Sequence, residues 1–304
     1  MTKRLGWTLL VGALVAAPAA RAKTPPAAKA KAAEPTFRFD PPIDRTFVES
    51  LRIEAIDLPA KGGKHLTNVA ADRELTFRKT PTGFALVDSQ TSFAKRVDGR
   101  KDAAPPEATM DGMPLTYDLD GSGKLRGIAG YEPLAGALAK VFPNAQANVV
   151  ESLARDVAEG DRQRRAETWR HRVAQLVGHP VPAAKAWVLD ETLELPTPDR
   201  DKVTVHGILR ASGTEPCDGR QCVRLDFVYD SDAKALPPES GPLEPLPWLR
   251  KRPIAPSPSV TVSGAGTRVI DPATMLIWSE TEERTMRAPT GTGLEKLVYS
   301  LKPR

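Results

Sequence analysis

The chain is poor in the residues from which most reactive sites are built. It has only two cysteines and four histidines in 304 residues, and the histidines do not form the His-Glu-x-x-His motif of zinc proteases. It also lacks a Gly-x-Ser-x-Gly motif, a Walker loop and a dinucleotide fingerprint after a strand. These absences favour a non-catalytic protein without a cofactor, although a triad assembled from distant residues would escape this test.

Apolar runs long enough to span a membrane are missing as well. The one sustained run, from Leu5 to Ala17, follows Lys3 and Arg4 and precedes the small-residue pattern Ala20-Arg-Ala22. This arrangement predicts a secretory signal peptide over residues 1–22, cleaved near Ala22, and no transmembrane span. We therefore expect a periplasmic or extracellular protein.

An excess of one charge sign is absent from the expected mature chain. Cleavage near Ala22 would remove Lys3, Arg4 and Arg21 and no acidic residue, so that 40 basic residues would face 38 acidic ones. So small a net charge gives no reason to expect long-range attraction to polyanions, and nucleic acid is not an expected partner.

The two cysteines lie close together, in Cys217-Asp-Gly-Arg-Gln-Cys222. In an exported chain such a pair predicts a disulfide across the tip of a hairpin. A metal site would need ligands besides two thiols, and no histidine lies beside them. A redox-active pair more usually has two residues between the cysteines.

The long helical pattern of the mature chain lies in residues 131–178. Leu134, Leu138 and Phe142 recur at helical spacing, and Pro143 is expected to end the first helix. With Trp169 from the next helical segment, these three residues are predicted to line the core or a ligand groove.

The second helical segment begins near Ala145, and its Gly160-Asp161 step is interpreted as a break and a new N-cap. The pattern therefore predicts a helical hairpin or one long kinked helix. Its polar face is rich in arginine, and we interpret it either as a solvated face or as a contact surface for anionic lipid or an acidic partner. The candidate contact residues are Arg162, Arg165 and Arg172.

Strand-like sequence lies on both sides of these helices. Met113, Leu115, Tyr117 and Leu119 alternate with polar residues, and so does the segment 223–229. Such alternation favours antiparallel pairing. The glycines of Gly264-Ala-Gly266 predict a turn between two short strands. The strand through Glu280 and Arg284 is polar on both faces, so one surface there is expected to face water. The predicted fold is α+β, a curved antiparallel sheet or half-barrel formed by N- and C-terminal strand sets around the central helices.

The expected organisation is a signal peptide, a linker and one β-rich domain. The linker, residues 23–43, is dominated by Ala, Lys and Pro and is expected to be disordered. The domain covers residues 44–303, with an N-terminal β half (44–130), the central helices (131–178) and a C-terminal β half (185–303). Its segment 236–259 holds eight prolines and is expected to be a surface loop, in which Trp248 pins the loop to the domain or contacts a partner.

The layout resembles a bacterial exported β-rich family of unknown function. The residues that carry the resemblance are Gly123-Lys-Leu-Arg-Gly-Ile-Ala-Gly130, Pro180-Val-Pro with Trp187, and Gly264-Ala-Gly-Thr-Arg-Val-Ile-Asp271. The family usually has a glycine shortly before the Trp, where this chain has Ala184-Lys185-Ala186. The topology is also similar to the half-barrel of periplasmic lipoprotein carriers. This resemblance implies a fold and an apolar groove, and it carries over no catalytic residue.

Two functions are consistent with these features. The first is an exported, non-catalytic envelope protein that binds an apolar or amphiphilic ligand, such as a lipid, in a groove between sheet and helices. The second is a structural or assembly protein of the envelope that acts through its Arg-rich helix face and its Pro-rich loop. A hydrolase with a spatially assembled site is a third hypothesis, which no motif supports.

Overall fold

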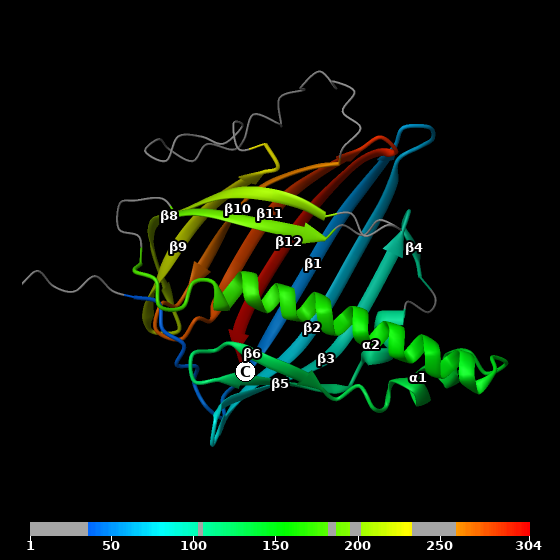
Figure 1. Ribbon diagram of the computed structural model, residues 1–304, viewed down its shortest axis with the longest axis horizontal. Helices are drawn as coiled ribbons and strands as arrows, with labels where there is room; N and C mark the ends of the chain where they lie inside the picture. Colours follow the sequence, from blue (N-terminus) through cyan, green and yellow to red (C-terminus); the bar gives the residue numbers. More distant parts are fainter. Residues whose placement is uncertain (1–35, 103–105, 182–186, 195–201, 233–259) are drawn as a thin grey trace, which may run out of the picture. The chain divides into compact units, whose positions relative to one another are not determined.

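The computed structural model describes residues 36–102, 106–181, 187–194, 202–232 and 260–304. These residues form a large antiparallel sheet with two α-helices, and Figure 1 shows the sheet as a curved, unclosed layer. The predicted α+β fold is confirmed. The predicted signal peptide, residues 23–35 of the predicted linker, and the Pro-rich segment with Trp248 lie outside the described residues.

Strands form where the chain alternates between apolar and polar residues. Their bounds are β1 (Thr46–Pro59), β2 (His65–Thr80), β3 (Gly83–Val97), β4 (Arg100–Lys101), β5 (Pro114–Asp120), β6 (Leu125–Ala129), β7 (Trp187–Glu194), β8 (Lys202–Cys217), β9 (Arg220–Asp230), β10 (Thr261–Ile270), β11 (Ile277–Ala288) and β12 (Gly291–Pro303). In β5 the alternation of the sequence is matched residue by residue, because Leu115, Tyr117 and Leu119 are buried and the residues between them are exposed.

The sheet joins the two ends of the chain. Its order is β6-β5-β3-β2-β1-β12-β11-β10-β9-β8-β7, and β4 pairs with β3. The first and last strands pair along their whole length, from Phe47 opposite Pro303 to Pro59 opposite Gly291. The N- and C-terminal strand sets are therefore two halves of one sheet. The pairing of β1 with β12 can form only after all the strands between them have been synthesised.

The helices connect the two halves. A 3₁₀ turn, η1 (Pro106–Met110), precedes β5, and after β6 come α1 (Leu134–Val141), α2 (Ala147–Trp169) and a π-helical turn, η2 (Arg170–Ala174). Helix α1 ends just before Pro143, as expected. The predicted break at Gly160-Asp161 is wrong: α2 runs through it, because Asp161 continues the buried face formed by Val150, Ala154 and Ala158.

The main hydrophobic core lies between the helices and the sheet, with most of its residues from the N-terminal half of the sheet and the helices and the others from the C-terminal half. It includes Leu134 and Leu138 of α1, which have no exposed surface, and it extends to the segment before β1. There Phe37 is buried, and the Phe39 ring makes edge contacts with Phe84 and Trp169. Residues 36–43 are thus not the disordered linker that composition predicted, because two phenylalanines are enough to dock this short segment.

Two glycines in the middle of β10 correct a second expectation. Gly264-Ala-Gly266 has the composition of a turn, yet β10 continues through it. A Cβ atom on Gly264 would lie 2.3 Å from the Tyr229 ring, and one on Gly266 would lie 2.5 Å from the Phe227 ring and 2.2 Å from the Thr281 carbonyl oxygen. The glycines therefore make room for the aromatic rings of the neighbouring strand β9.

We predict that Gly266→Ala lowers the free energy of unfolding by about 1–3 kcal/mol, the usual cost of overpacking. The new methyl group would clash with a backbone carbonyl of the paired strand, which no side-chain rotation can relieve. Denaturant unfolding followed by circular dichroism measures the change.

The matched control is Gly136→Ala in α1, where an added Cβ meets nothing within 4 Å. This substitution should leave stability unchanged or raise it by up to about 1 kcal/mol, because alanine favours helix over glycine. Equal stability of the two variants would contradict the packing role of Gly266.

Candidate functional site

Charged side chains lie buried between α2 and the sheet. We call the face of the sheet that α2 and η2 contact the inner face, and we call the buried and half-buried charged groups on it the inner-face ion network. Its members are Glu49, Arg73, Asp88, Asp161, Arg165, Arg172, Arg268 and Glu280. With Tyr117 and Tyr299 the network touches seven neighbouring strands, from β5 to β10.

Arg165 is the centre of the first part of the network. Its side chain is 7% exposed, and its guanidinium bonds the Asp88 carboxylate of β3 at 2.6 Å and the Asp161 carboxylate one helical turn earlier. Asp161 also accepts a hydrogen bond from the Tyr131 hydroxyl at 2.8 Å. The Tyr117 hydroxyl lies 3.1 Å from Arg165 and donates to Asp88. These bonds fix α2 against β3 and β5.

Arg172 forms the second part, on the other half of the sheet. Its Nε donates to a Glu280 oxygen of β11 at 2.8 Å, while Arg268 of β10 binds the other oxygen of the same carboxylate at 2.9 Å. The Arg172 guanidinium also lies over the Tyr299 ring of β12, 4.2 Å from its centre. The π-helical turn after α2 thus ties the helix directly to β11 and β12, and through Glu280 to β10.

Glu49 and Arg73 connect the two parts across β1 and β2. Arg73 lies 3.4 Å from Glu49 and 3.8 Å from Asp88. Burial and the charge of Glu49 raise the pKa of the Tyr299 hydroxyl, and the charge of Glu49 also favours the protonated form of Arg172. Helix α2 is therefore docked over a continuous row of alternating charges.

The network contains four carboxylates and four guanidiniums, so its formal charge is zero. Burial by itself would raise the pKa of the Asp161 carboxyl, but Arg165 and Arg164 outweigh burial and lower that pKa. The same balance at Glu280, with Arg172 and Arg268 against burial, lowers its pKa to about 2. Both carboxyl groups therefore stay ionised at neutral pH.

Within the described residues three buried atoms of the network have no hydrogen-bond partner: Arg73 Nε, Arg268 Nε and Asp88 Oδ1. Unsatisfied buried groups carry a desolvation cost. The network therefore specifies where α2 lies more than it adds to stability.

Beyond α2 the inner face continues as a half-buried surface. The registers place Val69, Ile53 and Leu297 in one row across β2, β1 and β12, two residues past the row of Tyr299. All three are partly exposed. Ala55, one step further along β1, extends this apolar strip.

The same rows become polar on β11 and β9. Glu282 pairs with Leu297, and Arg284 pairs with Glu295, whose carboxylate it binds at 2.7 Å. The Tyr229 hydroxyl donates to Glu282. Burial raises the pKa of Glu282, although Arg284 and the bond from Tyr229 act in the opposite direction. The inner face beyond α2 is thus apolar on one side and polar on the other.

The four predicted groove or core residues separate into two groups. Leu134 and Leu138 are fully buried, and Trp169 packs on the core while its indole N–H donates to the Gly123 carbonyl at 2.8 Å. Phe142 does not line the core or a groove: it is 41% exposed at the end of α1, because the helix stops there and its last residues extend past the packed face.

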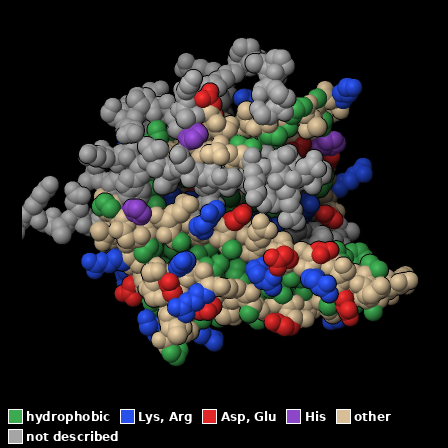
Figure 2. All heavy atoms as spheres, in the orientation of Figure 1, with side chains coloured by type: hydrophobic (Ala, Val, Ile, Leu, Met, Phe, Trp, Pro, Cys, Tyr) green, Lys and Arg blue, Asp and Glu red, His purple; other side chains and the backbone are tan. Residues whose placement is uncertain are grey.

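The predicted Arg-rich partner surface is corrected in a similar way. Arg165 and Arg172 point into the sheet, where buried carboxylates hold them, and only Arg162 keeps an exposed position, 40% accessible and 2.6 Å from Glu159. Figure 2 shows positive and negative side chains interspersed over the face that carries α2. This face is not a basic patch.

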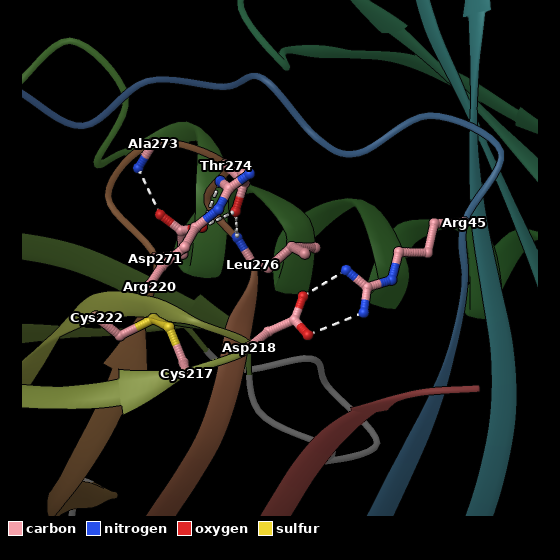
Figure 3. The surroundings of a disulfide bond; sticks show 9 residues. All are labelled: Arg45, Cys217, Asp218, Arg220, Cys222, Asp271, Ala273, Thr274 and Leu276. Carbon is pink, nitrogen blue, oxygen red and sulfur yellow. Dashed lines mark hydrogen bonds and ion pairs between the residues drawn. A yellow bond between two sulfur atoms is a disulfide. The ribbon is translucent and has the colours of Figure 1, made fainter.

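The predicted disulfide is present, between Cys217 and Cys222 at the turn from β8 to β9 (Figure 3). Asp218 in the same turn forms a two-bonded ion pair with Arg45, just before β1. Arg220 binds the buried Asp271, whose carboxylate also accepts bonds from the Ala273 amide and the Thr274 hydroxyl. The stapled turn is thereby fastened to two other segments.

Sequence reasoning missed the carboxylates of the network. The strand through Glu280 is polar on both faces, which predicts a surface facing water but not which residues lie on it, and Glu280 is only 3% exposed. One signal was available: Asp161 and Arg165 are spaced by four residues on the face that Ala154 and Ala158 also occupy. No local pattern could show that Asp88 and Glu280 would meet arginines 77 and 108 positions away.

No family model and no curated protein matches this chain. Among solved structures, lipovitellin, in a study of its lipid–protein interactions, aligns over 87% of this chain with 9% identity and a TM-score of 0.44. The chain spans 25% of that protein.

Two bacterial structures align as well. An exported protein with a YmcC-like fold from Bacteroides fragilis aligns over 86% of this chain and 97% of its own, with 10% identity and a TM-score of 0.20. OccK2 from Pseudomonas aeruginosa, in complex with glucuronate, aligns over 85% of this chain and 96% of its own, with 6% identity and a TM-score of 0.19.

Two further properties of the described residues concern membrane crossing and metal binding. None of their helices combines the length and hydrophobicity that a membrane crossing requires. Their His, Cys, Asp and Glu side chains form no group of three that could hold a metal ion.

We predict that Arg165→Met lowers the free energy of unfolding by about 3–5 kcal/mol, because it removes the buried guanidinium that Asp88 and Asp161 share. Arg164→Met is the matched control: Arg164 binds the same Asp161 but is 61% exposed, so its loss should cost at most about 1 kcal/mol. Equal losses in denaturant unfolding would contradict the burial of Arg165.

We also predict that the Glu280 pairing is lost in acid. The folded-state pKa of about 2 lies below the ordinary value of 4.5, so the pairing stabilises the fold above about pH 4.5 and disappears as the pH falls toward 2. The full contribution is about 3 kcal/mol.

The measurement is the unfolding free energy of wild type and Glu280→Gln between pH 6 and pH 2. The difference between the two proteins should be largest at pH 6 and shrink in acid. A difference independent of pH would show that Glu280 does not titrate as an ion-paired carboxylate.

Proposed function

We propose that this protein is an exported, non-catalytic binding protein that holds an amphiphilic ligand on the inner face of its sheet, beside α2. The apolar strip formed by Val69, Ile53, Ala55 and Leu297 would take the ligand's hydrocarbon part. The adjoining polar groups, Arg284 and Glu282, would face its head group.

The observation that supports this proposal most is that the pairing of β11 and β12 places apolar and polar side chains next to each other on the inner face. Leu297 of β12 is directly paired with Glu282 of β11, and two residues further along the same strands Glu295 is paired with Arg284, so an apolar side chain and an ion pair adjoin on one face. Partly exposed apolar side chains next to fixed polar groups are the usual composition of a site for an amphiphile. A purely structural face would have no need for this arrangement.

The non-catalytic part of the proposal is supported by how the charged groups are used. Both oxygens of Glu280 bind arginines, and Asp161 accepts bonds from two arginines and a tyrosine. Carboxylates held in this way are poor bases, because a proton would have to displace an ion pair. These carboxylates hold α2 on the sheet.

Export is supported by the sequence of residues 1–22 and by the disulfide at the β8–β9 turn. Disulfides persist in oxidising compartments and are rare in the cytosol. A periplasmic or extracellular location therefore belongs to the proposal.

A role in envelope assembly is the alternative function. Among the described residues it retains only Arg162 of the three arginines first assigned to a partner surface, since Arg165 and Arg172 are buried in ion pairs. The inner-face proposal is better supported for this reason.

We predict that Leu297→Lys weakens ligand binding by about tenfold or more, because it places an ammonium group in the apolar strip. Binding is measured by titration with palmitate and with a palmitoyl lysophospholipid, and by native mass spectrometry of the protein purified without detergent. The adjacent Val298→Lys is the matched control: Val298 is 40% exposed on the opposite face, so binding should be unchanged.

Equal effects of the two substitutions would place the ligand elsewhere. If neither probe binds and no amphiphile accompanies the purified protein, the proposed function is wrong. Conversion of the lysophospholipid into products would overturn its non-catalytic part.

A further inference from the structure

The corner where α1 meets α2 exposes apolar side chains that the fold does not use. Val141 and Phe142 at the end of α1 are 36% and 41% exposed, and Val149 and Leu153 in the first turns of α2 are 54% and 36% exposed. Val149 and Leu153 are four residues apart and so share one face of α2. Leu134, Leu138 and Val150, by contrast, are buried.

The four residues flank one short connection, Pro143–Gln146, that joins the helices. Figure 1 shows α1 beside the first turns of α2, at the end opposite to η2. We call Val141, Phe142, Val149 and Leu153, with the connection between them, the helical corner.

The sequence around the helical corner is almost free of charge. Between Glu132 and Glu151, Lys140 is the only charged residue, and it is exposed. The chain as a whole is 27% charged, so eighteen consecutive residues with one lysine and no acid depart strongly from its average. A lone lysine beside apolar side chains can extend its ammonium group toward phosphate while its stem stays in the apolar layer.

A second copy of the chain is a poor occupant for this corner. A stable dimer buries about 800 Å² on each partner, whereas four side chains that are half exposed present at most a few hundred Å². An interface with another protein would also be expected to show pairs of charged groups at its rim, which the corner does not have. A bilayer surface has no fixed pattern of charges to match, and the affinity of a small apolar area for it is increased by the attraction of a lysine to anionic head groups.

We propose that the helical corner inserts into the interface of a lipid bilayer that carries anionic head groups, with Phe142 and Val149 as anchors and Lys140 at the phosphate level. Residues 133–150 then rest in the membrane interface without crossing it. This inference is independent of the ligand on the inner face, because it uses none of the residues of the apolar strip.

The test is co-sedimentation of the purified protein with vesicles of phosphatidylcholine alone and of phosphatidylcholine with phosphatidylglycerol. We expect binding to both, about fivefold stronger with the anionic lipid, since one lysine near such a surface contributes about that factor. Lys140→Gln should remove this preference and leave binding to the neutral vesicles. Phe142→Ser with Val149→Ser should reduce binding to both vesicles about tenfold or more.

Val298→Ser is the matched control, because Val298 is equally exposed but lies on the outer side of the sheet; it should bind vesicles as wild type does. Insertion is followed directly with an environment-sensitive label on Phe142→Cys, compared with the same label on Val298→Cys. The native cysteines form a disulfide, so the added thiol is labelled alone. Only the label at position 142 should shift to the blue when vesicles are added.

Three results would overturn the proposal: absence of vesicle binding, equal loss in the control variant, or a dimer in sedimentation velocity that Phe142→Ser dissociates. Titration with palmitate separates this outcome from the proposed function. The Phe142→Ser, Val149→Ser protein should still bind the amphiphile if the inner face holds it.

Discussion

The docking of α2 on the sheet through buried ion pairs is the constraint on which the rest of the structure depends. Arg165 and Arg172 are seven residues apart, and each holds a carboxylate on a different half of the sheet. One helix therefore fixes β3 relative to β11, although these strands come from opposite ends of the chain. An apolar helix face could have slid along the sheet, whereas a row of alternating charges fits in one position.

This docking also decides what surface the protein offers. Arg172 of η2 lies over the Tyr299 ring, and the apolar strip with Ile53 and Leu297, two residues further along the strands, stays partly exposed. The same geometry leaves the helical corner outside the sheet contacts, since the buried residues of α1 end at Leu138. One set of ion pairs thus produces both the candidate ligand surface and the candidate membrane contact.

Several expectations failed for a common physical reason. Gly264 and Gly266 have turn composition, but the rings of Tyr229 and Phe227 cross the strand at these positions. Gly160 breaks a helical pattern only if Asp161 is read as a cap, and Asp161 is instead an ion partner of Arg165. In each case a contact with a residue distant in sequence outweighed a strong local preference. Such contacts cannot be inferred from local sequence patterns.

The sequence by itself determined what depends on neighbours along the chain: the alternating strands such as β5, the helix that stops before Pro143, and the disulfide between Cys217 and Cys222. Hydrophobic periodicity, the geometry of proline and the closure of short loops depend on residues that are close in sequence. They can therefore be inferred from the sequence alone. Only the tertiary structure decided that β1 pairs with β12, that Arg165 and Arg172 turn inward, and that Phe142 stays exposed. Those outcomes depend on which groups meet across the sheet, and a buried charge is stable only when the fold brings its counter-charge to it.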